Sequence, residues 1–471
     1  MLQKVATTGV SLDSVYDQTL QRIKEQKGGR SRLGMEVLMW VSHAERPLRI
    51  DELSHALAVE MEAMDFDPEN VPPQDTVLGS CLGLAVVDRE TSTVRLIHYT
   101  LQEHLSWNGV FPNAHRILGQ ACLTYLNYDQ VKGLPADNLS TLGDMSFLEY
   151  SSFYWGSHAK IELSDQAKSL ALELLNRYDH HISATLLLSR VGGRRSYPAT
   201  RHLFTGLHCA SYFGVAEVLV TLIEMEGCDI NQRDCMGRTP LMWAAQRGNE
   251  AIVRLLLTQY DVNPDKPNNS GRTPLWCASD QGHGGVVKLL LARNDVNPSE
   301  SDKCGETPLW RASFRGHEGV VRLLLTKNDV DPDKPDNSGR TPLLCASGDG
   351  NEGVVKLLLT RSDVDPDKPD NNGRTPLWQA SLNGNEFVAR LLLGRDDVNP
   401  DKPDNYGRTL LWWASASGKK EVVETLLTRR DVNPDRPDII GRTPLLVASM
   451  NGHREIVGLL QLRMTEVPSV E

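Results

Sequence analysis

The pattern of hydrophobic and polar positions in the C-terminal half of the chain repeats every 34 residues. Each copy begins with Thr-Pro-Leu or a close variant, has an alanine five residues later and a glycine nine residues later, and continues with valines and leucines. A polar stretch rich in Asp, Asn and Pro completes the copy. The copies begin at Thr205, Thr239, Thr273, Thr307, Thr341, Thr375, Thr409 and Thr443. A fixed period of this length predicts stacked supersecondary units.

The third copy shows which elements each unit is predicted to form. Thr273 is placed to cap a helix, Pro274 suits its first turn, and Gly282 ends it. The apolar residues of 283–293 recur at helical spacing, which predicts a second helix. The Pro, Asp and Gly residues of 295–305 predict a long loop. Because one such unit cannot bury its apolar face alone, the units must stack.

These units resemble the ankyrin repeat family through T-P-L-x-x-A, the following glycine, the VVKLLL helix and the DVN after it. The resemblance covers about 203–462 and implies a solenoid of about eight units. The period is 34 residues rather than the 33 usual in the family. The histidine of the family's T-P-L-H occurs only at His208. We expect the other copies to hold this corner by apolar packing; they carry Met242, Trp276, Trp310, Leu344, Trp378, Trp412 and Leu446 there.

The stretch DVDPDKPDNSGRTPL at 329–343 carries four aspartates within eight residues, which raises the question of a calcium site. An EF-hand loop needs glycine at position six and glutamate at position twelve. Counted from Asp329, those positions hold Lys334 and Arg340, and two prolines restrict the backbone. We therefore interpret the stretch as the exit from one unit, with D-N-S-G as the tight turn at the tip of the next finger loop.

The resemblance implies that partners bind along the concave side of the array, through the finger tips and the exposed face of the first helices. The residue between the tip glycine and the threonine forms a series of six arginines and one glutamate, namely Arg238, Arg272, Glu306, Arg340, Arg374, Arg408 and Arg442. Two interpretations of this arginine series stay open. It is either a basic stripe for an acidic partner, or each arginine pairs with the turn residue four positions earlier, as Arg340 would with Asp336.

Variable positions give a second set of candidate contacts. The two residues before each helix-ending glycine, and the residues at the finger tips, differ between copies while the framework is constant. The adjacent Phe314 and Arg315 are of the type that anchors protein interfaces. Together with two tryptophans one position beyond the core, the predicted contacts are Trp243, Arg247, Gln281, Phe314, Arg315, Asp349, Asn383, Tyr406 and Trp413.

The first 202 residues do not follow the repeat. In 1–110, helical stretches precede two short apolar strands and another helix. This order resembles the winged-helix segment that follows the NACHT nucleotidase in fungal NOD-like receptor proteins, through LDSVYDQTLQRI, LMWVSHAERPLRIDELSHALAV and VRLIHYTLQEHL. A winged helix can also bind DNA, but RIDELSHALAVEMEAMDFD is too acidic for a recognition helix. Residues 111–202 are predicted to be a helical connector, 203–462 the repeats and 463–471 a C-terminal tail.

The predicted fold is therefore mostly α, an ankyrin-repeat solenoid preceded by a winged-helix-like and helical domain. Composition then narrows the function. A net charge of −11 and a pI near 5.7 argue against general binding of nucleic acid. Without a run of about 18 apolar residues no membrane span is expected. The eight cysteines include no C-x-x-C, which indicates reduced thiols and a cytoplasmic, or else nuclear, location.

Candidate chemistry is sparse. No G-x-x-x-x-G-K-[ST] occurs, so we expect no nucleotide cofactor. The pair His180-His181 has no further ligands at metal spacing, and Cys122 lies on an apolar stripe. We predict no catalytic, cofactor or metal-binding residues. The main hypothesis is a protein-interaction module that forms the sensing and regulatory part of a fungal NOD-like receptor. An independent scaffold or adaptor is the alternative, and a metal-dependent or catalytic protein is the distant third.

Overall fold

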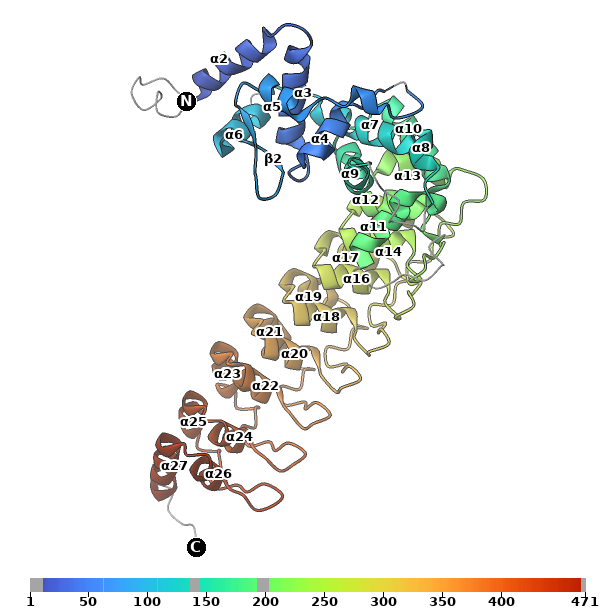
Figure 1. Cartoon of the computed structure of the whole chain (residues 1–471). Helices are drawn as coiled ribbons and strands as arrows, with labels where there is room; N and C mark the ends of the chain where they lie inside the picture. Colours follow the sequence, from blue (N-terminus) through green and yellow to red (C-terminus); the bar gives the residue numbers. More distant parts are fainter. Residues whose placement is uncertain (1–11, 62, 108, 136–144, 193–202, 467–471) are drawn as a thin grey trace. The chain divides into compact units, whose positions relative to one another are not determined.

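The computed structural model describes residues 12–61, 63–107, 109–135, 145–192 and 203–466. It forms two compact bodies. The N-terminal body comprises Met1–Ala244 and Arg254–Val262, and the C-terminal body comprises Ala245–Val253 and Asn263–Glu471. Figure 1 shows the elements of both. No helix among the described residues is both long and apolar enough to cross a bilayer.

The first part of the N-terminal body has the element order of a winged helix. Its elements are α2 (Leu12–Lys24), α3 (Arg30–His43), α4 (Ile50–Leu57), η1 (Pro68–Asn70), α5 (Gln74–Ser80), β1 (Ala85–Val87), β2 (Val94–Leu96) and α6 (Tyr99–Trp107). The strands pair antiparallel with Ala85 opposite Leu96, and a bridge from Arg49 to Thr93 adds a short third edge. Buried residues such as Leu38, Leu53 and Val77 form the core between α3, α4 and α5.

Helix α5 is an element that sequence reasoning missed. It is the last of the four α-helices described before the hairpin, and it follows Pro72 and Pro73, which fix the entry of the chain into its first turn. The acidic stretch RIDELSHALAVEMEAMDFD lies on α4 and the loop after it. Helix α5 reads QDTVLGS and contains no Lys or Arg, so it supplies no cation for a DNA backbone either.

A bundle of helices completes the N-terminal body. Its elements are α7 (Ala114–Asn127), α8 (Asp129–Lys132), α9 (Leu148–Ile161), α10 (Asp165–Asn176), η3 (Tyr178–His180), α11 (Ile182–Gly192), α12 (Gly206–Phe213) and α13 (Ala216–Ile223). Helices α12 and α13 are the pair of the first repeat. A Cβ on Gly156 would lie 2.2 Å from the Phe213 ring, so the absence of a side chain on α9 lets α12 approach it closely.

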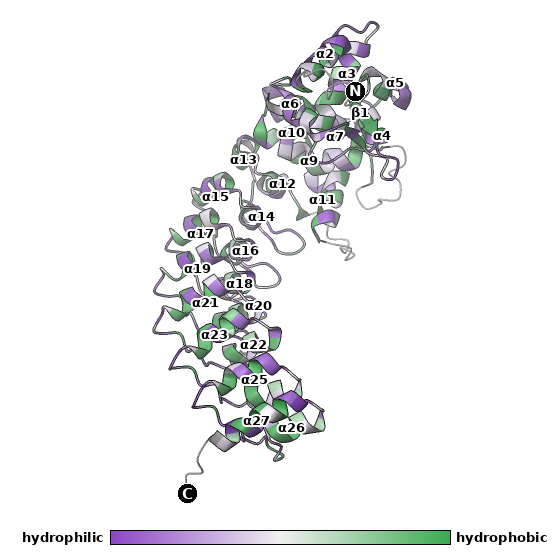
Figure 2. Ribbon diagram, turned by 90° about the vertical axis from the view of Figure 1, so that its left-hand side faces the viewer, coloured by the Kyte–Doolittle hydropathy of each residue, from purple (hydrophilic) through white to green (hydrophobic). Residues whose placement is uncertain are grey.

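The remaining repeats form helix pairs with the predicted boundaries. Helices α14 (Pro240–Arg247) and α15 (Glu250–Leu257) are shared between the two bodies. The C-terminal body contains α16 (Pro274–Gln281), α17 (Gly284–Leu291), α18 (Pro308–Arg315), α19 (Glu318–Leu324), α20 (Pro342–Asp349), α21 (Glu352–Leu359), α22 (Pro376–Asn383), α23 (Glu386–Leu393), α24 (Leu410–Ala416), α25 (Lys420–Leu427), α26 (Pro444–Met450) and α27 (Arg454–Glu466). The even-numbered first helices form one layer and the odd-numbered second helices another (Figures 1 and 2).

Most repeats of the C-terminal body begin and end their first helix through the same local chemistry. In the repeat of α18, the Thr307 hydroxyl accepts a hydrogen bond from the Trp310 backbone N–H at 3.0 Å, and Pro308 occupies the first turn. Gly316 ends the helix with φ 76°, a conformation that strongly favours glycine. Helix α27 runs to Glu466, past the predicted start of the tail at 463, and Arg463 there donates to the Arg429 carbonyl of the preceding repeat at 3.5 Å.

Candidate interaction surface

The corner that a histidine occupies in the first repeat is occupied by tryptophan in several others. His208 Nε2 lies 3.1 Å from the carbonyl of Arg238, thirty residues onward. The indole N–H of Trp310 donates to the carbonyl of Arg340, again thirty residues onward, at 2.8 Å. Trp276 and Trp412 donate in the same way to Glu306 and Arg442, at 3.1 and 2.9 Å. The expectation of purely apolar packing at this corner was therefore wrong for these three tryptophans.

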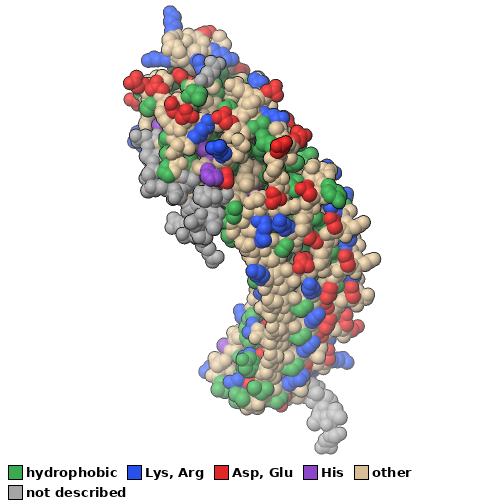
Figure 3. Space-filling view, turned by 90° about the vertical axis from the view of Figure 1, so that its right-hand side faces the viewer, with side chains coloured by type: hydrophobic (Ala, Val, Ile, Leu, Met, Phe, Trp, Pro, Cys, Tyr) green, Lys and Arg blue, Asp and Glu red, His purple; other side chains and the backbone are tan. Residues whose placement is uncertain are grey.

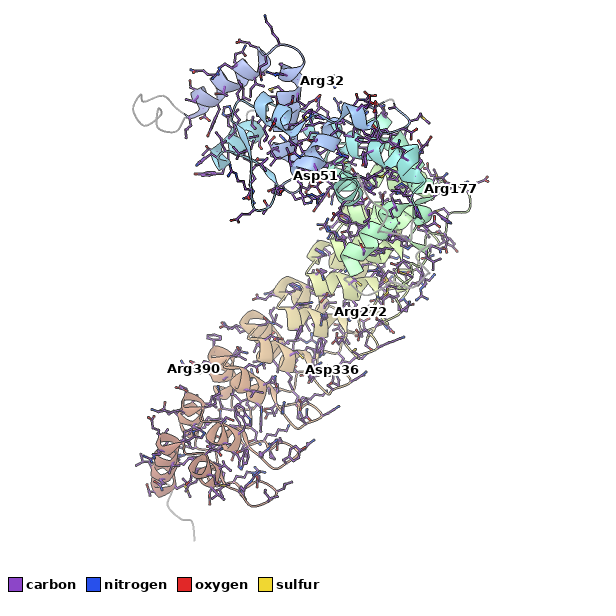
Figure 4. The ribbon with its side chains drawn as sticks, viewed as in Figure 1. Arg32, Asp51, Arg177, Arg272, Asp336 and Arg390 are labelled. Carbon is purple, nitrogen blue, oxygen red and sulfur yellow. The ribbon has the colours of Figure 1, made fainter. Side chains whose placement is uncertain are left out.

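The finger loops place the arginine series against the turn aspartates. In the stretch 329–343, the Asp336 carboxylate accepts the backbone N–H groups of Ser338 and Arg340 and binds the Arg340 guanidinium at 2.6 Å. The guanidinium carbon lies 5.2 Å from the Trp310 ring centroid, close enough for a cation–π contact. Arg340 is thus held by a carboxylate and an indole together. Figure 4 shows Asp336 and Arg272 on the finger side of this body, with Arg390 on the second-helix side.

Three other arginines of the series pair with the turn aspartate four positions earlier in the same way. Arg408 binds Asp404 at 2.6 Å, Arg442 binds Asp438 at 2.8 Å, and in the N-terminal body Arg238 binds Asp234 at 2.8 Å. This geometry corresponds to the paired interpretation, in which most of the guanidinium charge is already engaged within the protein. Both signs of charge accordingly lie along the face of the C-terminal body in Figure 3, rather than one basic stripe.

Three members of the series differ. Arg272 follows Asn268 rather than an aspartate, and it reaches Asp302 of the next finger at 3.3 Å. Glu306 lies 3.7 Å from Arg311, so it accepts an arginine instead of supplying one. Arg374 is half-buried and makes no ion pair with any described residue, although its backbone N–H binds Asp370 at 2.9 Å.

Phe314 and Arg315 lie together at the end of α18. The Phe314 ring stacks on Trp310 with 5.5 Å between centroids, and it is half-buried. Arg315 is exposed and bonds to Asp280 of the preceding repeat at 3.0 Å; Arg311 reaches the same carboxylate at 2.6 Å. The aromatic face and the guanidinium edge are therefore preorganised next to each other, which lowers the entropy that a partner would have to restrict.

The other predicted contact residues have different surroundings. Trp243 is 1% exposed, packs on Phe204 and Tyr212 and donates to Asp234, so its ring cannot meet a partner and that prediction is corrected. The reason is that Trp243 fills the space beneath the Asp234–Arg238 pair. Trp413 is half-buried. The side chains of Arg247, Gln281, Asp349, Asn383 and Tyr406 are exposed.

Sequence reasoning missed a hydrogen bond that links successive repeats. In most repeats of the C-terminal body, the residue after the helix-ending glycine bonds to the carbonyl 37 positions earlier: His317 Nε2 to Asp280 at 3.0 Å, Asn351 Nδ2 to Phe314 at 2.9 Å and Asn385 Nδ2 to Gly348 at 2.7 Å. His283 and His453 occupy the same position and bond to Gln246 and Ala416. The signal was present in the sequence, because His or Asn recurs there at the 34-residue period.

That link is absent at one junction of the C-terminal body. Between the repeats of Thr375 and Thr409 the position is Lys419, whose exposed side chain makes no hydrogen bond to a described residue. A Cβ on Gly384 would meet open space, whereas one on Gly316 would lie 2.6 Å from Asn351. A cavity of about 310 Å³ opens there between α23 and α25, with Gly384 and Lys419 in its lining.

Bulky side chains account for the wider spacing of the helices at this junction. Gly348 on α20 faces Gln379 on α22, and the equivalent residues at the next junction are Leu382 and Trp413. Helices α22 and α24 approach each other less closely than the other neighbouring first helices from α16 to α26. The finger side stays joined, because Asn405 N–H donates to Asn372 at 3.1 Å and Lys402 donates to Asp367 at 2.7 Å. The junction is thus closed on the finger side and open on the helix side.

The remaining aspartates of the acidic loop also bind the backbone. Asp333 accepts the N–H of Asp365 in the next loop at 2.7 Å, while its other oxygen is buried without a partner among the described residues. Burial raises the pKa of Asp333, and it does the same for Asp367 and Asp401 at the equivalent positions. These carboxylates have a structural role in joining one loop to the next.

Known protein families match the two parts of the chain separately, one the repeats and one the N-terminal segment. A family model described as "Ankyrin repeats (3 copies)" matches residues 207–302, 287–370, 349–438 and 398–467. A model described as "GPI inositol-deacylase, winged helix domain" matches residues 20–113. The chain is also similar to the crystal structure of the ankyrin repeat domain of Bcl-3, a member of the IκB protein family. The identity is 30% over 48% of this chain and 99% of that chain, with a TM-score of 0.44. No curated protein matches.

Proposed function

The chain belongs to the ankyrin repeat family, since the family model covers more than half of it, and we propose that it works as a non-catalytic protein-interaction module whose partner binds the finger side of the C-terminal body. Ankyrin repeats indicate a protein–protein interaction module in general. Two further points are proposed for this chain: which of its surfaces binds the partner, and to which kind of larger protein it belongs.

The observation that carries the proposal is a variable surface on a constant framework. Thr caps, glycine ends and finger turns recur in each repeat of the C-terminal body, while the residues before each glycine change. Phe314 and Arg315 offer an aromatic face beside a guanidinium, a combination that is frequent at the centre of interfaces. Apolar side chains are exposed at the tips, with Tyr406, Ile439 and Ile440 at 58%, 68% and 67%. Such exposure at successive tips is typical of a binding surface.

The charge of the surface limits the type of partner. The pairing of most of the arginine series with turn aspartates favours a partner other than an acidic tail. We infer a partner that presents apolar side chains to the tips and a carboxylate to Arg315, which is exposed and contacts Asp280 through its Nε, on a carboxylate that it shares with Arg311. Arg374, the one member of the series in the described part of the chain without an ion pair, is a second position for a partner carboxylate.

Affinity capture with the full chain tests the proposed face. The double variant Phe314→Ala, Arg315→Ala is compared with wild type and with Phe387→Ala, Arg390→Ala. The control removes the same two residue types from exposed positions on α23, on the second-helix side. We expect specific partners to be depleted at least 10-fold by the first variant and retained by the second. Retention by both variants, or loss only with the control, would show that the partner binds elsewhere.

We further propose that the chain is the sensing and regulatory part of a NOD-like receptor of the fungal NACHT type. A winged-helix segment, a helical connector and ankyrin repeats follow one another in the predicted order of such receptors, with boundaries at about 1–110, 111–202 and 203–462. Transcript sequencing upstream of the Met1 codon tests this proposal. A continuous frame encoding a nucleotidase supports it, whereas an in-frame stop codon directly upstream would favour the independent scaffold.

A further inference from the structure

Three potential metal ligands come together in the N-terminal body. Glu45 follows α3, His115 lies in the first turn of α7, and His158 lies on α9. One ligand atom from each lies within 4.8 Å of the other two, and no other group of three or more His, Cys, Asp or Glu ligands does so within the described ranges. The three residues are far apart in the sequence, so no spacing motif announces them, and the sequence prediction of no metal site could not include them.

The two histidines face each other through their Nδ1 atoms, which lie 2.9 Å apart. In a metal-free chain one ring must donate a proton to the other at this distance. Two nitrogen ligands of one tetrahedral Zn²⁺ lie about 3.3 Å apart, given Zn–N bonds of about 2.0–2.1 Å. An ion can therefore replace the shared proton with a shift of only a few tenths of an ångström.

The outer partners orient His158 as a ligand. Its Nε2 lies 3.0 Å from the Tyr150 hydroxyl, which also accepts the Glu45 backbone N–H at 3.1 Å. An Nε2–H that donates to Tyr150 leaves the Nδ1 lone pair directed at His115 and Glu45. Metal-binding histidines usually have such a partner on the second ring nitrogen, because it fixes the tautomer.

An ion at this position would have access to solvent. A cavity of about 640 Å³ is lined by His43, Glu45, Phe111, His115 and Glu162 among others. Of the three ligands, Glu45 is exposed and His115 is half-buried, and both line this cavity, whereas His158 is fully buried behind His115. Two protein nitrogens and one carboxylate leave a coordination position open toward this cavity, as in three-ligand zinc sites.

Neighbouring charges are compatible with a cation. The guanidinium of Arg46, the residue after Glu45, is bonded through both its terminal nitrogens to buried Glu52, which neutralises it. Glu162 on the cavity wall pairs with Arg116 at 3.9 Å, so these two charges offset each other. The His43 ring lies 5.7 Å from His115, and its Nδ1 is already engaged by Ser42.

We propose that Glu45, His115 and His158 bind one Zn²⁺ or a similar divalent transition-metal ion. The ion would join the loop after α3 to helices α7 and α9, and so connect the winged-helix segment to the helical bundle behind it. This site is separate from the proposed partner surface.

Zinc titration of the untagged full chain against a chromophoric chelator tests the site. All proteins carry Cys304→Ser, which removes the one fully exposed thiol of the described residues as a competing ligand. The test variants are Glu45→Gln and His115→Gln, both outside the buried core, and His180→Gln is the control because its side chain is exposed. We expect one Zn²⁺ per chain in the parent and the control, with affinity at least 10-fold weaker in each test variant.

A second readout separates metal binding from folding. Saturating Zn²⁺ is expected to raise the Tm of the parent and the control but not of the test variants, since only the native site binds the ion. The circular dichroism spectra without metal should be the same for all four proteins. A parent that binds no zinc, or test variants that bind it as tightly as the parent, would overturn the proposal and leave His115–His158 as a structural hydrogen bond.

Discussion

At the residue scale, the repeats preserve a hydrogen bond while changing the side chain that makes it. His208 in one repeat and Trp276, Trp310 and Trp412 in others all reach the carbonyl thirty residues onward. A neutral imidazole and an indole can each donate one N–H, and the indole buries more apolar area. The family histidine and the tryptophan of this chain are therefore two solutions to one requirement, the satisfaction of a carbonyl at the base of the finger.

The substitution Trp310→Phe tests this equivalence. It keeps most of the ring but removes the N–H that satisfies the Arg340 carbonyl, so we expect a loss of about 1 kcal/mol in stability. Trp378→Phe is the matched control, since the Trp378 indole makes no hydrogen bond to a described residue. Urea denaturation of the full chain measures both. Equal losses in the two variants would mean that ring volume, not the hydrogen bond, matters at this corner.

Buried loop carboxylates give a pH dependence at the same scale. The pKa values of Asp333, Asp367 and Asp401 are raised by burial, so each group holds its proton to higher pH in the folded than in the unfolded chain. Their stabilising contribution is present below the unfolded pKa of about 3.9 and is lost as pH rises through the folded value. A triple Asp→Asn variant should therefore gain stability relative to wild type between pH 4 and pH 7.

Thermal denaturation at several pH values measures this difference. Asp435→Asn serves as the control, because Asp435 occupies the equivalent position in the last repeat and is exposed. If the Tm difference between the triple variant and wild type stays constant with pH, these carboxylates are not titrating in the way that their burial predicts.

At the element scale, the junction between α22–α23 and α24–α25 is the distinctive feature of the C-terminal body. This junction holds Leu382 opposite Trp413, where the preceding junction has Gly348 opposite Gln379, and it has Lys419 where neighbouring junctions have a bonding His or Asn. A cavity opens between the second helices as a result. The loss of one inter-repeat hydrogen bond reduces the coupling of adjacent repeats, on which the stability of a solenoid depends.

Introducing a hydrogen-bonding side chain at position 419 tests whether Lys419 weakens this junction. We expect Lys419→Asn to donate to the Leu382 carbonyl, as Asn385 does to Gly348, and to stabilise the pair by roughly 0.5–1.5 kcal/mol. Hydrogen exchange of α25 amides should slow accordingly. Asn385→Lys is the reverse control and should speed exchange in α23. Unchanged exchange in α25 would indicate that the separation of the helices, not the lysine, sets the weakness of the junction.

At the scale of the whole molecule, periodicity determined what could be predicted. Helix pairs, caps such as Thr307 and the turn at Asp336 follow from short-range sequence and recur at the 34-residue period, so one correct copy predicts the rest. Helix α5 lacked such support, being seven residues without a strong apolar pattern. The pairing of Arg272 with Asp302 needed knowledge of the next finger. The meeting of Glu45, His115 and His158 depends on tertiary packing alone.

The central claim is that a protein partner binds beside α18, and photo-crosslinking tests it most directly. A photoreactive phenylalanine analogue replaces Phe314 in one full-length variant and Phe387, exposed on α23, in another. Because both sites hold phenylalanine, the two probes disturb the chain to a similar degree. The proposal predicts discrete crosslinked proteins from position 314 in cell extract and none from 387. Equal crosslinking from both positions, or crosslinks from 387 alone, would contradict it.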